Sequence, residues 1–221
     1  MQTYATTAPV TAVLDIAAGR VQLIAADRAD TTVEVRPATP GRSRDVRAAE
    51  LTVVAFEDGV LRVSTPEAAR RALGPSGSVE VTVQLPAGSR VEATVAAADL
   101  RAVGRLGEVV LTGAAGSVKI DEAAAARIGL QAGDVRLARL TGDAEISTVK
   151  GDLDVAEAHR GTLALRTGAG HITVGAARGV SAALDAGTAH GRVSNALRND
   201  GTPVLAVSAT TSYGDITARS L

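Results

Sequence analysis

The chain of 221 residues contains no cysteine and no tryptophan, and Tyr4, Phe56 and Tyr213 are its only aromatic residues. The absence of cysteine excludes disulfide bonds and thiolate chemistry. Modules that stack bases or sugars use several aromatic faces, so this scarcity argues against RNA-recognition and single-strand-binding modules. A core built from Ala, Val, Leu and Ile must be narrow, because small side chains fill only the space between closely spaced backbones.

Strong net charge and long apolar runs are also missing. A net charge of −1 with 21% charged residues argues against a general attraction to nucleic acid or to an anionic membrane. The first twenty residues lack a basic region followed by a continuous apolar segment, and no run approaches the roughly 18 apolar residues of a membrane span. We therefore expect a cytoplasmic protein with no nucleic-acid partner and no membrane insertion.

A short phrase recurs instead, for example as "GDLDV" at 151–155 and as "GHITV" at 170–174. The residue after the glycine position falls at 99, 117, 134, 152, 171, 192 and 215, which gives intervals of 18, 17, 18, 19, 21 and 23 residues. A second series of apolar stretches alternates with the first, at 108–112, 126–131, 143–148, 161–167, 180–185 and 204–210. Each unit holds two short strands and two turns, which is too short for a βαβ crossover.

This repeat predicts an all-β fold, a parallel β-solenoid in which successive coils stack about 4.8 Å apart. The preference of parallel crossovers favours a right-handed coil. Period-2 alternation places pairs such as Val135 and Leu137 inside and Arg136 and Asp154 outside. The glycines are explained by a sharp corner with φ > 0, and the following aspartate is expected to bond its own backbone. The predicted structural corners are Gly116, Gly133, Asp134, Gly151, Asp152, Gly170, Gly191, Gly214 and Asp215.

Residues 1–98 show longer alternating strands, and Asp58-Gly59 is typical of a β-hairpin turn. The stretches 36–50 and 65–78 are interpreted as polar insertions, the second with one helical turn. An antiparallel section over 1–98 would cap the N-terminal end of a solenoid over 99–221, because the first coil would otherwise present an open edge. We expect one continuous elongated domain.

Three features together resemble a known family. They are "VTVQLPAGSRVEATVAAADLRAVG" at 81–104, the Gly-Asp corners at 133–134, 151–152 and 214–215, and the closing "HGRVSN…TSYGDITARSL". The chain resembles, over nearly its entire length, the bacterial putative-adhesin family of β-strand-repeat domains of unknown function, which is related to toastrack domains. The resemblance implies a β-helix with an N-terminal antiparallel section and no catalytic or cofactor residues. Ala97-Ala98-Asp99 departs from the glycine usual in the family, so this corner is expected to turn differently.

Two patterns could support chemistry. Asp134 and Asp152 should stack on adjacent coils, near the separation used by retaining glycosidases, so a carbohydrate-active β-helix enzyme is one alternative. Their corner positions explain them without catalysis, and no aromatic sugar platform lies nearby. His159, His171 and His190 are spaced 12 and 19 residues apart, without the short spacing of metal ligands. We expect no metal and no cofactor.

Arg101, Lys119 and Arg136 are predicted to form an outward column of positive charge. A regulatory module that binds an anionic ligand is therefore a second alternative, although Glu92, Glu108 or Asp121 could neutralise the column. A solvated face of mixed charge is the simpler interpretation.

The leading hypothesis is a non-enzymatic interaction or scaffold protein. Its final strand "GDITARSL" reaches Leu221 without a following cap, so the C-terminal coil should expose strand edges. We expect a protein partner, or self-association, at this coil. The candidate interface residues are Val204, Tyr213, Thr217, Arg219 and Leu221.

Overall fold

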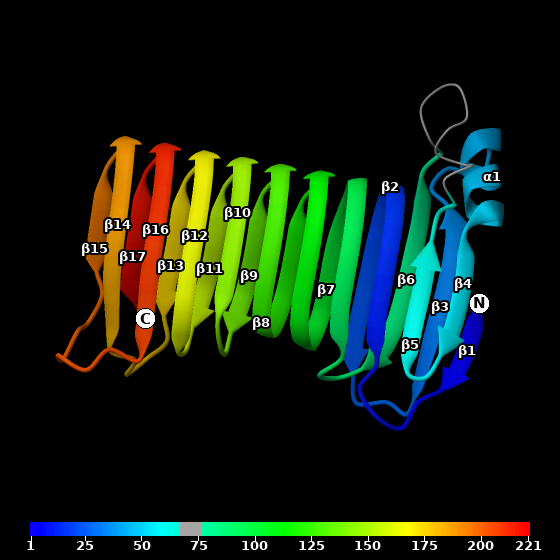
Figure 1. The fold of residues 1–221 in the computed structure, drawn as a ribbon, viewed down its shortest axis with the longest axis horizontal. Coiled ribbons are helices and arrows are strands. Elements are labelled where there is room, and N and C mark those ends of the chain that lie inside the picture. The colour runs from blue at the N-terminus through cyan, green and yellow to red at the C-terminus, as the bar shows by residue number, and fades with distance from the viewer. Residues whose placement is uncertain (67–76) are drawn as a thin grey trace. The chain divides into compact units, whose positions relative to one another are not determined.

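A computed structural model describes residues 1–66 and 77–221 (Figure 1). The described chain is almost entirely β-structure and divides into two compact units, Met1–Gly116 and Ser117–Leu221. The elements of the first unit are β1 (Gln2–Ala5), β2 (Thr11–Ala26), β3 (Asp30–Pro37), α1 (Ser43–Leu51), β4 (Val53–Glu57), β5 (Val60–Ser64), β6 (Val79–Pro86) and β7 (Arg90–Ala115). Those of the second are β8 (Val118–Ala132), β9 (Val135–Leu140), β10 (Ala144–Lys150), β11 (Leu153–Ala158), β12 (Gly161–Ala169), β13 (Ile172–Ala176), β14 (Ala182–His190), β15 (Val193–Ala196), β16 (Leu205–Tyr213) and β17 (Ile216–Ser220).

The first unit combines parallel coils with an antiparallel cap. β2 is paired in parallel with β7 on one side and with β5 and β6 on the other. β4 runs antiparallel to β5, β3 antiparallel to β6, and β1 antiparallel to β3. The predicted antiparallel section is therefore present, but parallel pairing already begins at β2. The sequence could not show this, because alternation has the same period in parallel and antiparallel strands.

Two local details of the first unit bear on the sequence analysis. Asp58 and Gly59 form the β4–β5 turn with φ values of 49° and 75°, which confirms the predicted hairpin. Residues 43–51 of the expected polar insertion instead form α1, which packs against β3 and β6. Asp45 is buried in the first turn of α1, and its Oδ1 accepts a 3.0 Å hydrogen bond from the Ser78 amide. The helical turn predicted within 65–78 falls largely at 67–76, outside the described residues.

The second unit is a two-walled parallel solenoid (Figure 1). One wall contains the C-terminal half of β8 followed by β10, β12, β16 and β14. The other contains the N-terminal half of β8 followed by β9, β11, β13, β17 and β15. The predicted alternation is confirmed: Val135 and Leu137 are buried, whereas Arg136 between them is exposed.

The spatial order of the last coils differs from their order in the chain. β16 lies between β12 and β14, and β17 lies between β13 and β15. The expectation that residues 204–221 form the end coil is therefore wrong. The end coil consists of β14 and β15, and the C-terminal strands are inserted behind it, where both of their edges are paired.

The core of this unit tapers toward the end coil at one level of the second wall, whereas the level that ends at Val193 does not. The inward residues at the tapering level are Leu137, Val155, Val174, Ala218 and Asn195, in spatial order. Shrinking side chains reduce the apolar area that the last coil would otherwise expose to water. The series ends in an amide whose Oδ1 accepts a 3.0 Å hydrogen bond from the Leu197 amide.

Candidate binding surfaces

The predicted corner glycines occupy backbone that other residues would strain. All six have positive φ, from 134° at Gly116 to 156° at Gly170 and Gly191. The neighbouring coil also approaches closely: a Cβ on Gly151 would lie 2.1 Å from the Gly133 carbonyl oxygen, and one on Gly170 would lie 2.0 Å from that of Gly151. The expected difference at Ala98 is also seen, since this corner has no positive φ.

The residues after these glycines form a ladder of hydrogen bonds between coils. Asp134 Oδ1 accepts a 2.9 Å bond from the Asp152 amide, and Asp152 Oδ1 accepts a 2.7 Å bond from the His171 amide. The bonds therefore run to the next coil, and not to the residue's own backbone as the sequence analysis expected. Each carboxylate therefore holds the corner of the next coil in place. Asp134 and Asp152, which the sequence suggested as a possible catalytic pair, thus have a structural role.

The same ladder continues, but its next acceptor is an imidazole nitrogen and not a carboxylate oxygen. His171 Nδ1 accepts a 3.0 Å bond from the Asp215 amide, and Asp215 Oδ1 accepts a 2.9 Å bond from the Arg192 amide. Accepting this bond requires an unprotonated Nδ1, so the imidazole replaces a carboxylate as acceptor. Arg192 stands on the end coil and has no acceptor atom in its side chain, so the series of acceptors stops where the solenoid stops.

A second ladder, of inward threonines, was missed by the sequence analysis. Thr167 Oγ1 donates to the Gly151 carbonyl at 2.9 Å, Thr211 to that of Gly170 at 3.1 Å, and Thr188 to that of Gly214 at 3.0 Å. These hydroxyls satisfy carbonyl groups that would otherwise be left without a partner inside the corner. The signal was a threonine three residues before the corner glycine, in "TVKG", "TGAG", "TSYG" and "TAHG".

The three histidines lie apart. His159 Nε2 lies 3.4 Å from Glu157 Oε1, His171 belongs to the corner ladder, and His190 stacks on Tyr213 with ring centroids 4.7 Å apart. Within residues 1–66 and 77–221, no group of three or more His, Asp or Glu side chains is placed to hold a metal ion. In the same ranges no helix has the length and hydrophobicity that a membrane span requires.

The predicted basic column is partly neutralised. Lys119 and Arg136 are neighbours in register, and Arg136 Nε lies 3.0 Å from Asp154 Oδ2. Arg101 belongs to the first unit, where it is exposed beside Gln22. Glu92 and Glu108 both pair with Arg90. The arrangement around Arg136 is that of a solvated face of mixed charge.

The predicted interface residues are exposed to different degrees. Val204, Tyr213 and Leu221 have exposed fractions of 59%, 60% and 47%. Arg219 is exposed, whereas Thr217 is partly covered between β13 and β15. The open strand edges lie beside them: among the described residues, β14 pairs only with β16 and β15 only with β17.

Ser181 joins the two loops, 177–181 and 197–204, that connect the last coils in their changed spatial order. Its carbonyl accepts hydrogen bonds from the Val204 and Leu205 amides, at 3.0 and 3.3 Å, and its hydroxyl accepts one from the Asp200 amide at 3.1 Å. The side-chain hydrogen bond with Ser181, followed by the Thr202 amide, lowers the pKa of Asp200 below its ordinary value. The loops 177–181 and 197–204 are thereby fixed together.

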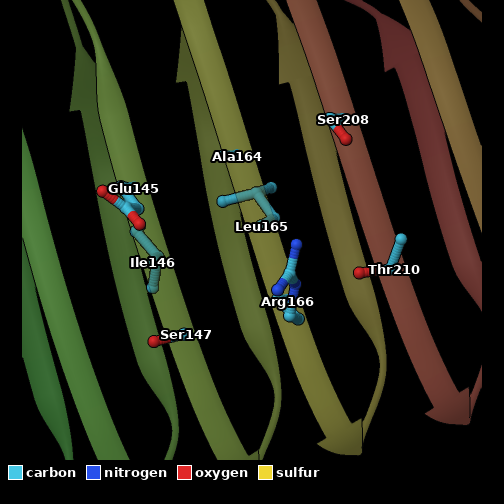
Figure 2. A pocket seen from close by; sticks show the side chains of 8 residues that line it. All are labelled: Glu145, Ile146, Ser147, Ala164, Leu165, Arg166, Ser208 and Thr210. Atoms are coloured by element: carbon cyan, nitrogen blue, oxygen red, sulfur yellow. The ribbon is translucent and has the colours of Figure 1, made fainter.

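The outer wall of β10, β12 and β16 contains a shallow depression around Arg166 (Figure 2). Arg166 is flanked in register by Ser147 on β10 and by Thr210 on β16. Its outward neighbours along β12 are the small residues Ala164 and Gly168. We refer to these five residues as the Arg166 patch.

No curated protein matches the chain, whereas several solved structures do. A solved structure of a putative adhesin from Bacteroides fragilis is 14% identical, with a TM-score of 0.48 and coverage of 98% of this chain and 95% of that one. A putative cell adhesion protein from Clostridium sporogenes is 11% identical, with a TM-score of 0.38 and coverage of 100% and 98%.

The family assignment rests on the sequence itself. The model of one family, described as Toastrack DUF4097, matches residues 13–220. This match spans the antiparallel cap except β1, both walls of the solenoid and the inserted C-terminal strands. The chain belongs to the Toastrack DUF4097 family, and its fold is a β-solenoid with an antiparallel cap.

Proposed function

We propose that this protein is a non-enzymatic interaction module that associates with a second copy of itself through the open edge of β14 and β15. The observation that supports it is the unpaired edge itself, where Val193 is 44% exposed. Unpaired strand edges are templates for pairing with another chain.

The hydrogen bonding of β15 indicates which backbone groups face outward. The Arg192 carbonyl accepts a 2.9 Å bond from the Ile216 amide, so it faces β17. Alternation along a strand then turns the amide and carbonyl of Val193 toward the open edge. A twofold axis normal to the walls would pair β14 antiparallel with β14 of the second copy, and β15 likewise. Such an isologous interface closes at the dimer.

The taper of the core sets the strength of this association. At one level the end coil presents the Asn195 amide in place of an apolar side chain, which leaves Val193 as its exposed large hydrophobic residue, so backbone hydrogen bonds would supply most of the specificity. We expect a weak, reversible dimer. The absence of catalysis is supported by the corner ladder, since Asp134 and Asp152 each accept an amide of the next coil.

Sedimentation analysis over a wide concentration range tests the proposal. Val193→Lys places a charge on the open edge and should yield a monomer at concentrations where the wild type is dimeric. Val204→Lys is the matched control, because Val204 is 59% exposed but lies in a loop, so it should leave the dimer intact. Equal sedimentation of the wild type and Val193→Lys would refute edge pairing, and dissociation by Val204→Lys alone would move the interface to the C-terminal coil.

A further inference from the structure

Among the described residues, Arg166 differs from Arg127, Arg136 and Arg139 of the second unit in having no carboxylate partner. Arg127, Arg136 and Arg139 each pair with an acidic residue on an adjacent strand. Among the described residues, none forms an ion pair with Arg166, which is exposed on β12. A guanidinium offers five N–H donors in a planar fork that matches a carboxylate.

The surroundings of Arg166 leave room for a ligand. Ser147 and Thr210 lie directly across from it on the neighbouring strands, and both are exposed. Figure 2 shows Arg166 between these two side chains on the same outer wall. Gly129 and Gly187 continue the same row on β8 and β14, so short side chains surround the guanidinium.

The nearby carboxylate does not neutralise this position. Glu145 lies on β10 one outward position from Ser147, and its Oε2 is 3.7 Å from Arg127 Nε. The Glu145 carboxylate is therefore directed to Arg127 on β8. This direction leads away from Arg166, because β8 and β12 flank β10 on opposite sides. A ligand anion at Arg166 would meet one cation without an ion pair and two hydroxyl groups, and the Glu145 carboxylate, directed to Arg127, also lines the depression.

From this arrangement we infer that the Arg166 patch binds an acidic side chain of an extended peptide segment in a protein partner. The inference rests on the proposed role as an interaction module, but it uses the outer wall and not the edge of β14 and β15.

Three features favour a peptide over other anions. A single cation does not match the repeated phosphates of a nucleic acid. The residues around the depression include no aromatic ring on which a sugar could stack. Val149, 66% exposed, lies on β10 one outward position beyond Ser147 and offers an aliphatic contact. An extended peptide with an aliphatic residue two positions from an acidic one would direct both side chains at this wall, because alternate side chains share a face and are about 7 Å apart.

Nuclear magnetic resonance titration of the full chain tests this inference. The probe is the blocked peptide acetyl-Val-Ala-Glu-Ala-Val-amide, with the Gln analogue as its neutral counterpart. We expect the Glu peptide to shift the amide signals of Ser147, Arg166 and Thr210, with a dissociation constant about 10-fold lower than that of the Gln peptide. Arg166→Gln should abolish this difference. Arg178→Gln, which removes an exposed arginine from the loop between β13 and β14, should preserve it.

Several results would overturn the inference. Equal affinity for the Glu and Gln peptides, no shift at millimolar peptide, or an unchanged response in Arg166→Gln would each remove the carboxylate site. Tighter binding of a galacturonate hexamer at the same amides would replace the peptide by a saccharide, and equal affinity for acetate would reduce the site to a nonspecific anion contact. Sedimentation of Arg166→Gln should match the wild type, so failure here is distinguishable from failure of the dimer proposal.

Discussion

The two units of this protein finish their outer coils in different ways. In the first unit β4 and β3 cover the edges of β5 and β6 with antiparallel strands, and α1 packs beside them. In the second unit no further described strand pairs with β14 or β15, and the core shrinks instead, from Leu137 to Asn195. Covering requires additional chain, whereas tapering requires only smaller residues.

The tapered end also lacks the bonds that join interior coils. An interior corner supplies an acceptor to the next coil, as Asp152 does for the His171 amide. Arg192, at the corresponding place on the end coil, supplies none. Interior and end positions should therefore respond differently to the same substitution, and three comparisons test this.

The largest difference is expected for glycine. Gly151→Ala places a Cβ 2.1 Å from the Gly133 carbonyl oxygen at a φ of 144°, so we expect a loss of about 3 kcal/mol or more in the free energy of unfolding. Gly187→Ala on β14 meets no atom within 4 Å. It should change stability by less than about 0.5 kcal/mol. Urea denaturation of both variants measures the difference, and equal losses would contradict the corner argument.

The next difference concerns the inward threonines. Thr167→Val keeps the shape but leaves the Gly151 carbonyl without its 2.9 Å donor, at a site where Thr167 is 3% exposed. The expected cost is about 1–3 kcal/mol. Thr188→Val removes the same bond on the end coil, where Thr188 is only partly buried and water can replace the hydroxyl. A larger effect in Thr188→Val would show that the end coil is not the more hydrated one.

A smaller effect is expected at the corner ladder. His171→Ala removes the acceptor for the Asp215 amide and should cost about 0.5–1.5 kcal/mol. His171→Asn retains an acceptor oxygen at a similar position and should recover most of that loss. Arg192→Ala, on the end coil, should be nearly neutral because its side chain accepts nothing. Thermal unfolding measures the stability of the three variants. An unchanged unfolding midpoint for His171→Ala would show that the corner ladder does not stabilise the fold.

The smallest effect is a pH dependence in the crossing loops. The pKa of Asp200 is lowered from its ordinary value of 3.8, with the Ser181 hydrogen bond as the largest cause. A depressed pKa stabilises the fold above the ordinary value, and this contribution is lost as pH falls below it through the folded pKa. The unfolding midpoint of the wild type should therefore fall relative to that of Asp200→Asn as pH decreases from about 4 to about 2. A constant difference over this range would contradict the assignment.

Several features of the solenoid were predictable from local patterns. The interval of 17–19 residues predicted parallel coils, since no helical crossover fits in so short a unit. Alternation identified the buried Val135 and Leu137 and the exposed Arg136. The Asp58-Gly59 turn was predictable because positive φ at both positions favours these residue types.

The spatial order of the last coils could not be predicted from local patterns. The final intervals lengthen to 21 and 23 residues, and the additional residues form the loops that pass over one coil and return. The lengthening signals longer loops but does not say which neighbour a strand will choose. The Arg166 patch was hidden for a similar reason, because Thr210 lies beside Arg166 only as a result of that choice.

The sequence by itself determined the coil, its corners and the two faces of each strand, because these depend on the φ of glycine and on the alternation of side chains along one strand. Only the tertiary structure decided that β16 and β17 are inserted between earlier coils and that β14 and β15 form the open end. The physical reason is that every coil presents nearly the same edge. The choice among neighbours depends on side-chain size across the whole core and on the bonds that Ser181 makes between distant loops.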